Sequence, residues 1–246
     1  MKVLFLSDGD HRGGGDVAAA TLGRAIAKEV GSFDWIMRSS NGVDEPWRRH
    51  FLPSMIDMPL PWRGFARAAG PLWRDAGTVR SRLYNSWIRK LLREYLIKLR
   101  PDVIQVHGLH VSGWGFDVLE TCHEFAPVVY TFHDFWHTTA RCMYPFECRQ
   151  FESGCTATCP TAEQHPRLHP AEIHNEWATR ERIVSRCKHL KGVAVSEYIR
   201  DESNRGAWRN TEVDIIRNGV DLMRDFVPLD TREARTPSVE QRGLVQ

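Results

Sequence analysis

Apolar residues along the chain fall into short continuous runs that alternate with longer stretches of helical spacing. The short runs have the pattern of buried parallel strands. They are Lys2–Ser7, Phe33–Met37, Asp102–His107, Pro127–Phe132, Gly192–Val195 and Val213–Ile216. Helices are predicted from Asp16 to Ala27, Val79 to Leu99 and Pro170 to Cys187, and from Ser196 onward. Strands that alternate with helices predict an open, mostly parallel α/β sheet with helices on both faces.

Residues 43 to 80 lack such a pattern. Prolines interrupt this stretch at Pro46, Pro53, Pro59, Pro61 and Pro71. Because proline removes a backbone donor and fixes its own φ, we expect a long loop with short helical pieces.

Composition excludes several classes of protein. The chain has 246 residues, of which 42% are hydrophobic and 26% charged, as in ordinary globular proteins. Lys+Arg 33 against Asp+Glu 31 leaves a net charge of +2, too small to draw the chain to nucleic acid or an anionic membrane. No run approaches the ~20 apolar residues that a spanning helix needs, and the first apolar run is too short for a signal peptide. We expect a cytoplasmic protein.

A glycine-rich turn follows the first predicted strand. In open parallel sheets, ligands bind beyond the carboxyl ends of the strands. Gly13, Gly14 and Gly15 remove every Cβ there, so backbone N–H groups could close on a phosphate or sugar at a helix N-terminus. The alternative is a flexible turn with Asp16 as the helix N-cap. The spacing differs from Gly-x-Gly-x-x-Gly, which disfavours a dinucleotide site.

Histidines follow two further strands, at His107 and His133. If these strands are neighbours, both side chains point into one crevice. His133 and Asp134 could then form a hydrogen-bonding or proton-transfer pair near neutral pH. Phe135 and Trp136 could provide a wall on which a sugar stacks. The alternative is that each histidine is a structural polar residue.

Four of the six cysteines crowd into a cysteine- and proline-rich insertion, residues 136–168. They are Cys142, Cys148, Cys155 and Cys159. In a reducing compartment such a crowd indicates a metal site or buried thiols. A tetrahedral zinc is one interpretation, although Cys-x3-Cys is looser than the usual Cys-x2-Cys. Nothing nearby predicts a thiolate nucleophile.

Taken in order, these motifs resemble the amino-terminal domain of family 4 glycosyltransferases of GT-B fold, in the subgroup of colanic-acid type. The resemblance runs from Met1 to about Arg235. It rests on Lys2-Val-Leu-Phe-Leu-Ser with Gly13–Gly15, on Pro101-Asp-Val-Ile-Gln-Val-His107, on Pro127-Val-Val-Tyr-Thr-Phe-His-Asp-Phe-Trp136, on Cys142-Met-Tyr-Pro, on Gly154-Cys155 with Cys159-Pro160, on Val195-Ser-Glu197 and on Ile216-Arg-Asn-Gly-Val-Asp221.

The resemblance implies one Rossmann-like half of a two-domain enzyme. Such enzymes transfer a sugar from a nucleotide diphosphate sugar to a hydroxyl acceptor, with retention and without a required metal, in polysaccharide or glycolipid assembly. By resemblance, His133 is the catalytic residue, and Gly13, Gly14 and Gly15 approach the donor phosphates. The expected acceptor-binding residues are His107, His110, Asp134 and Trp136. The implied partners are a sugar or lipid-linked acceptor and a separate donor domain, with contact at the inner face of the membrane and no nucleic acid.

In the family, a motif like Asn218–Asp221 leads into the donor-binding domain. Here 25 residues follow Asp221, and those from Thr236 onward resemble nothing in that domain. We therefore expect an acceptor-side domain over residues 1–221 and a truncated, disordered tail over 222–246, with little activity in the isolated chain. The alternatives are a non-catalytic module that binds a glycan, lipid or partner, and a nicotinamide-dependent oxidoreductase.

Overall fold

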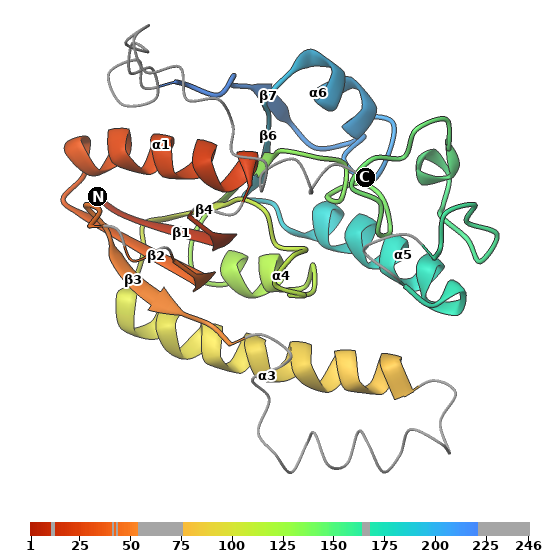
Figure 1. Ribbon diagram of the computed structural model, residues 1–246, viewed down its shortest axis with the longest axis horizontal. Helices are drawn as coiled ribbons and strands as arrows, with labels where there is room; N and C mark the ends of the chain where they lie inside the picture. Colours follow the sequence, from red (N-terminus) through yellow and green to blue (C-terminus); the bar gives the residue numbers. More distant parts are fainter. Residues whose placement is uncertain (11–12, 41, 43, 54–75, 164–167, 221–246) are drawn as a thin grey trace, which may run out of the picture.

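The computed structural model describes residues 1–10, 13–40, 42, 44–53, 76–163 and 168–220, apart from the side chains of 76–83. The expected tail, 222–246, lies outside these residues. Seven strands form one sheet (Figure 1). They are β1 (Lys2–Gly9), β2 (Ser32–Ser39), β3 (Arg48–Phe51), β4 (Val103–Val106), β5 (Val128–Phe132), β6 (Leu190–Ala194) and β7 (Val213–Ile215). The helices are α1 (Gly14–Glu29), α3 (Ala76–Leu99), α4 (Val118–His123), α5 (Pro170–Arg186), α6 (Glu197–Ser203) and the 3-10 turn η2 (Gln150–Glu152).

The strand order is β3-β2-β1-β4-β5-β6-β7, and every neighbouring pair is parallel. The chain builds outward from β1 to β3, returns to the other side of β1, and continues outward from β4 to β7. The expected Rossmann-like α/β sheet is therefore confirmed. The order reverses between β1 and β4, and ligands of such sheets bind at this kind of reversal.

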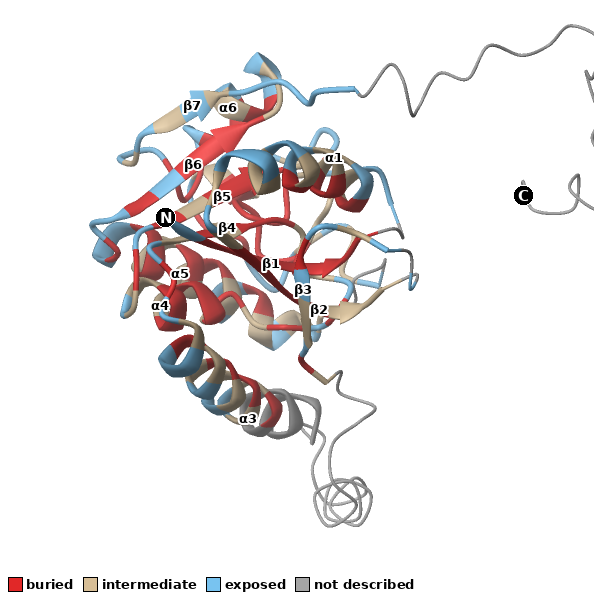
Figure 2. Ribbon diagram, turned by 90° about the vertical axis from the view of Figure 1, so that its left-hand side faces the viewer, coloured by how far each residue is buried: buried red, intermediate tan, exposed pale blue. Residues whose placement is uncertain are grey.

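Helices cover both faces of the sheet: α1 lies on one face, and α3, α4 and α5 lie on the other (Figure 1). The apolar core is divided in the same way. Under α1 the core residues are Val3, Phe5, Ala19, Ala20, Phe33, Trp35, Met37 and Trp47. The larger cluster on the other face includes Leu4, Ile88, Leu92, Val106, Leu119 and Ile183. Figure 2 shows the central strands buried between these layers. No described helix is long and apolar enough to cross a membrane.

One strand and one α-helix were not predicted from the sequence, nor was the 3-10 turn η2. The stretch 43–80, expected to be a loop with helical pieces, contains the strand β3 and the start of α3 at Ala76; residues 54–75 lie outside the description. The short helix α4 was also missed. Its six residues, Val118–His123, are too few to show a helical period.

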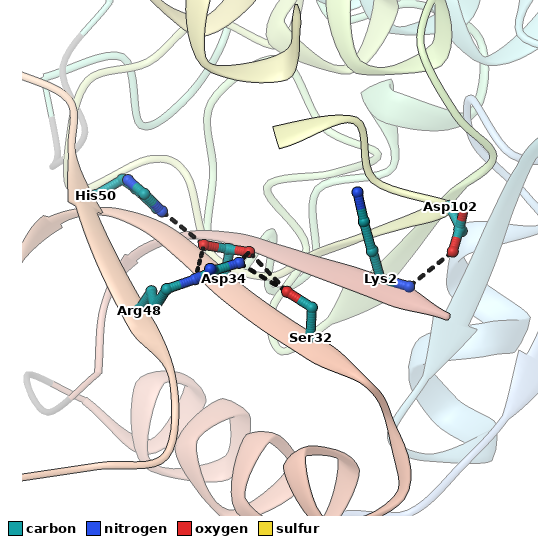
Figure 3. Close-up of polar contacts among 6 residues, drawn as sticks. All are labelled: Lys2, Ser32, Asp34, Arg48, His50 and Asp102. Atoms are coloured by element: carbon teal, nitrogen blue, oxygen red, sulfur yellow. Dashed lines mark hydrogen bonds and ion pairs between the residues drawn. The ribbon is translucent and has the colours of Figure 1, made fainter. Parts of the chain in front are cut away.

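The edge strand β3 is held to β2 by a polar network around Asp34 (Figure 3). Arg48 donates from Nε and Nη2 to the two carboxylate oxygens of Asp34, at 2.9 and 2.7 Å, and Nε2 of His50 lies 2.8 Å from Oδ1. Burial alone would raise the pKa of Asp34, but the hydrogen bonds of Arg48 and His50 outweigh it and lower the pKa. Polar contacts, and not buried apolar side chains, hold β3 to β2. For this reason the sequence of β3 lacks the alternation of apolar and polar residues by which a half-buried strand is predicted.

The cysteine-rich segment packs on α5 through a small core of its own. Its members are Ala140, Phe151, Cys155, Ile173 and Trp177. The indole Nε1 of Trp177 donates to the carbonyl oxygen of Phe151 at 2.9 Å. This segment therefore has a fixed conformation with little regular secondary structure.

Candidate functional site

The glycine-rich turn opens directly into α1. Gly13 is the N-cap, with an extended φ of −156° and no side-chain cap. Asp16 lies inside the first turn and is buried, so the alternative of an Asp16 N-cap is wrong. No described residue accepts a hydrogen bond from the N–H groups of Gly14 or Gly15. The N-terminus of α1 is thus available to an anion, which its N–H groups and dipole favour.

His133 packs against this N-terminus. A Cβ on Gly15 would lie 3.1 Å from Cγ and 3.2 Å from Cδ2 of the His133 ring, tighter than nine in ten Cβ contacts in proteins, so the ring would have to shift by a few tenths of an ångström. A Cβ on Gly13 or Gly14 would meet nothing within 4 Å. The last glycine therefore makes room for His133, and the first two leave open space at the helix end.

His107 and His133, which follow β4 and β5, contact each other. Nδ1 of His107 lies 3.0 Å from Nε2 of His133, and the rings stack at 21° with centroids 5.3 Å apart. His107 is only 1% exposed, so its side chain lies behind His133 and not at the surface. The hydrogen-bond partner of His133 is His107, whereas the sequence suggested Asp134.

Burial keeps both imidazoles neutral. It lowers the pKa of His133 to about 4, and burial with the nearby His133 holds the pKa of His107 well below its usual value. A neutral His133 can make hydrogen bonds at neutral pH. It is poorly suited to hold a proton for transfer, since its charged form is rare above pH 5.

Asp134, His110 and Trp136 form a second group at the same edge of the sheet. Oδ2 of Asp134 lies 3.5 Å from Nδ1 of His110, and Oδ1 accepts the backbone N–H of Trp136 at 2.9 Å. Burial raises the pKa of Asp134, against the opposing effect of His110. The rings of His110 and Trp136 lie 6.0 Å apart. Trp136 is only 7% exposed, so it offers little of its face to a ligand.

Arg180, a residue that the sequence did not point to, holds Trp136 in place. Its guanidinium lies 4.5 Å from the centroid of the Trp136 ring and 5.1 Å from that of Phe116. Its Nε donates to the carbonyl oxygen of Trp136 at 3.1 Å. Arg180 is 1% exposed and pairs with Glu176 at 3.0 Å. A buried arginine of this kind is fixed by cation–π contact and hydrogen bonds together.

Asp8, at the end of β1, was also missed. Its carboxylate accepts the backbone N–H groups of Val111 and Ser112 at 3.0 and 2.8 Å, and its own N–H donates to the carbonyl of Gly108. These bonds fix the loop that carries His110. An acidic residue that ends a buried apolar strand was the signal in the sequence.

The four clustered cysteines line one cavity of about 10 Å³, at the lower limit of what a single water molecule needs. All are free thiols, and Sγ of both Cys142 and Cys159 lies 3.7 Å from Oγ1 of Thr161. Burial raises the pKa of Cys155 to about 11. Within the described part of the chain, no group of three or more His, Cys, Asp or Glu side chains is placed to hold a metal ion. The arrangement is that of packed thiols, and the zinc interpretation stays a prediction.

Two comparisons with known proteins bear on the family of this chain. The model of Glycosyltransferase Family 4 matches residues 12–224. The chain is also similar to "Putative colanic acid biosynthesis glycosyl transferase WcaC" of Escherichia coli (strain K12), with 26% identity over 147 residues. The match covers 55% of this chain and 35% of that protein, so the chain matches about a third of its relative's length.

Proposed function

Since the chain belongs to glycosyltransferase family 4, we propose that it transfers a sugar from a nucleotide diphosphate sugar to a hydroxyl acceptor, with retention at the anomeric carbon. In this proposal the domain described here is the acceptor side of the enzyme and works with a donor-binding domain. The similarity to the colanic acid protein favours polysaccharide or glycolipid assembly as the setting.

The contact between His133 and Gly15 carries this proposal. It places a neutral imidazole beside the open N-terminus of α1. There the helix dipole and the free N–H groups would stabilise the negative charge that develops on a departing diphosphate. The imidazole of His133 would hydrogen-bond the sugar whose bond to that diphosphate breaks. Neither group needs a metal for this role.

The acceptor would bind next to this point, along the loops after β4 and β5. Asp134 has a side chain 28% exposed and bonded to the backbone of Trp136, so a free lone pair of its carboxylate could take a hydroxyl of the acceptor. His110 beside it would hold that carboxylate in place. His107 and Trp136 are too deeply buried for broad contact with an acceptor, and we assign them supporting roles.

The expected acceptor is a sugar or a lipid-linked sugar. An enzyme that uses a lipid-linked acceptor works at the inner face of the membrane. It needs only peripheral contact there, which fits a cytoplasmic protein.

A transfer assay tests the proposal. The chain would be assayed alone and fused to the donor-binding domain of a family 4 relative, with UDP- and GDP-sugars and a polyprenyl diphosphate-linked sugar as acceptor. Release of nucleoside diphosphate and mass spectrometry of the acceptor are the readouts. We expect turnover by the fusion and far less than ~1 s⁻¹ by the chain alone.

In the active form, His133→Ala is expected to lower kcat by about 10²-fold or more, the range for a positioned polar group. His189→Ala, which changes an exposed histidine, is the matched control and should leave kcat unchanged. Absence of transfer by both forms, with intact fold, would overturn the proposed activity. Full activity of a folded His133→Ala protein would overturn the assignment of the site.

A further inference from the structure

The pair of histidines behind the glycine-rich turn has one buried ring nitrogen without a partner. Nδ1 of His107 and Nε2 of His133 share a hydrogen bond of 3.0 Å. Nε2 of His107 is enclosed and has no hydrogen-bond partner. Nδ1 of His133, by contrast, is not a fully buried atom, and no described side chain bonds to it.

A neutral imidazole carries one N–H, so the shared bond can be made in two ways. If His133 donates from Nε2, the hydrogen of His107 must sit on its own Nε2, where no acceptor is present. If His107 donates from Nδ1, its Nε2 keeps only a lone pair, and the hydrogen of His133 must sit on Nδ1. Buried N–H groups without an acceptor are rarer in proteins than unpaired acceptors, so the second arrangement is favoured.

We propose that His107 is a positioning residue that fixes the tautomer of His133, so that His133 presents an N–H donor, and not a lone pair, to a ligand beside the N-terminus of α1. The substrate atom it meets must then be an acceptor, such as a sugar hydroxyl oxygen or a phosphate oxygen. His133 in this state cannot act as a base at Nδ1. The identity of that substrate atom rests on the proposed function; the tautomer itself does not.

The surroundings hold this arrangement in place. Cγ and Cδ2 of the His133 ring face Gly15, 3.1 and 3.2 Å from where a Cβ of that residue would lie. The ring therefore cannot flip without moving its hydrogen bond to His107. Because β4 and β5 are neighbouring parallel strands, the two rings are held by the sheet itself.

Nuclear magnetic resonance of the full chain with ¹⁵N-labelled histidine rings tests the proposal without donor, acceptor or activity. Long-range ¹H–¹⁵N correlation at pH 7.5 distinguishes the protonated from the unprotonated ring nitrogen. We expect His133 to be protonated on Nδ1 and His107 on Nδ1. His133→Gln, which removes one set of signals, assigns the spectrum. A His133 ring protonated on Nε2 would overturn the proposal.

Two variants of His107 separate positioning from packing. His107→Asn keeps an N–H donor near the place of Nδ1 and should leave the His133 signals in the Nδ1-protonated pattern. His107→Leu keeps the bulk but removes the donor, which leaves Nε2 of His133 without a partner. The tautomer is then no longer fixed, so the His133 signals should move away from the Nδ1-protonated pattern toward a mixture of the two tautomers. In the transfer assay, kcat of the leucine variant should fall at least about 10-fold below that of the asparagine variant. Unchanged His133 signals in a folded leucine variant would overturn the role of His107. If neither variant folds, the protonated nitrogen of His133 in the wild-type spectrum tests the proposal by itself.

Discussion

Gly15 and His133 are 118 positions apart in the chain, yet a Cβ on Gly15 would lie only 3.1 Å from Cγ of His133. The first helix and the fifth strand of the sheet therefore meet at this point. Glycine suits position 15 because the His133 ring occupies the space that a side chain would need, and not only because glycine makes the turn flexible.

Replacement of this glycine should be costly. In Gly15→Ala, the new methyl group must displace the His133 ring, so we expect the free energy of unfolding to fall by about 1–3 kcal/mol, the range for overpacking. Gly14→Ala, one residue away with open space around it, is the control. It should be neutral or stabilising by up to about 1 kcal/mol, because alanine is the better helix former. Denaturant unfolding of both variants is the measurement, and equal stability would show that the contact carries no strain.

Asp8 should be important for the loop that carries His110. Asp8→Ala leaves the backbone N–H groups of Val111 and Ser112 without their acceptor. The loss should be about 1–3 kcal/mol for the buried N–H of Ser112, and less for the part-buried N–H of Val111. Asp8→Asn keeps an oxygen that can accept one of these bonds, so its loss should be about half as large. Hydrogen exchange of the amides of Val111 and Ser112 should speed up in the same order. Protection that is unchanged in Asp8→Ala would contradict this role.

Stability should fall with acid over the range in which free histidine titrates. Burial lowers the pKa of His133 to about 4 and that of His137 to about 3, below the value of 6.5 in an unfolded chain. Below pH 6.5 the unfolded state takes up these protons first. The stability is therefore complete above this pH and is lost as the pH falls toward 4, with a slope of up to about 1.4 kcal/mol per pH unit for each histidine.

Urea unfolding at pH 7.5, 6.0 and 5.0, followed by tryptophan fluorescence, measures this slope. His137 lies with Nε2 2.6 Å from Oγ of Ser203, which itself donates to the carbonyl of Ile199. His137→Gln can keep the donor to Ser203 but does not titrate, so it should flatten the slope. The exposed variant His189→Gln should have a smaller effect, since His189 acts on the pKa of the partly exposed His123 alone. Equal stability of the wild type at pH 7.5 and 5.0 would contradict the prediction.

The buried thiols should be slow to react. Burial raises the pKa of Cys155 and Cys187 to about 11, and burial also raises that of Cys122. Since the thiolate is the nucleophile, iodoacetamide at pH 7.5 should label Cys155 and Cys187 about 10²-fold more slowly than free cysteine. Mass spectrometry of peptides over time gives the rates, and denaturant should remove the protection.

Elemental analysis of the same preparation, purified without chelator, tests the zinc interpretation. About one zinc per chain would support the zinc interpretation, since a structural site of four thiols holds one metal ion. Metal-free protein with slow labelling would agree with packed thiols.

Most of the sheet could be predicted from the sequence, because buried parallel strands are apolar throughout. The exception is β3, whose residues Arg48 to Phe51 are held at the sheet edge by Asp34, an interaction between side chains that no local pattern shows. The start of α1 was placed two residues late, since Gly13 caps the helix without a side chain.

The place of the candidate site could be predicted better than its contacts. The rule that ligands bind at the carboxyl ends of parallel strands brought Gly15, His107 and His133 to one edge. That rule cannot tell whether His133 pairs with its neighbour in sequence or with a ring on the next strand, because the answer depends on strand register and side-chain torsions. Arg180 could not be found at all, since it reaches Trp136 from a helix 44 residues further along the chain.

The separate small core under the cysteine-rich segment has a consequence for how this domain could diversify. Phe151 and Cys155 pack with Ile173 and Trp177 of α5, apart from the two larger clusters that flank the sheet. A segment with its own core can be exchanged between relatives, together with the part of α5 beneath it, without repacking the sheet. Chimeric proteins built at this boundary would therefore inherit a new surface on the cysteine-rich segment while the contact between Gly15 and His133 stays as it is.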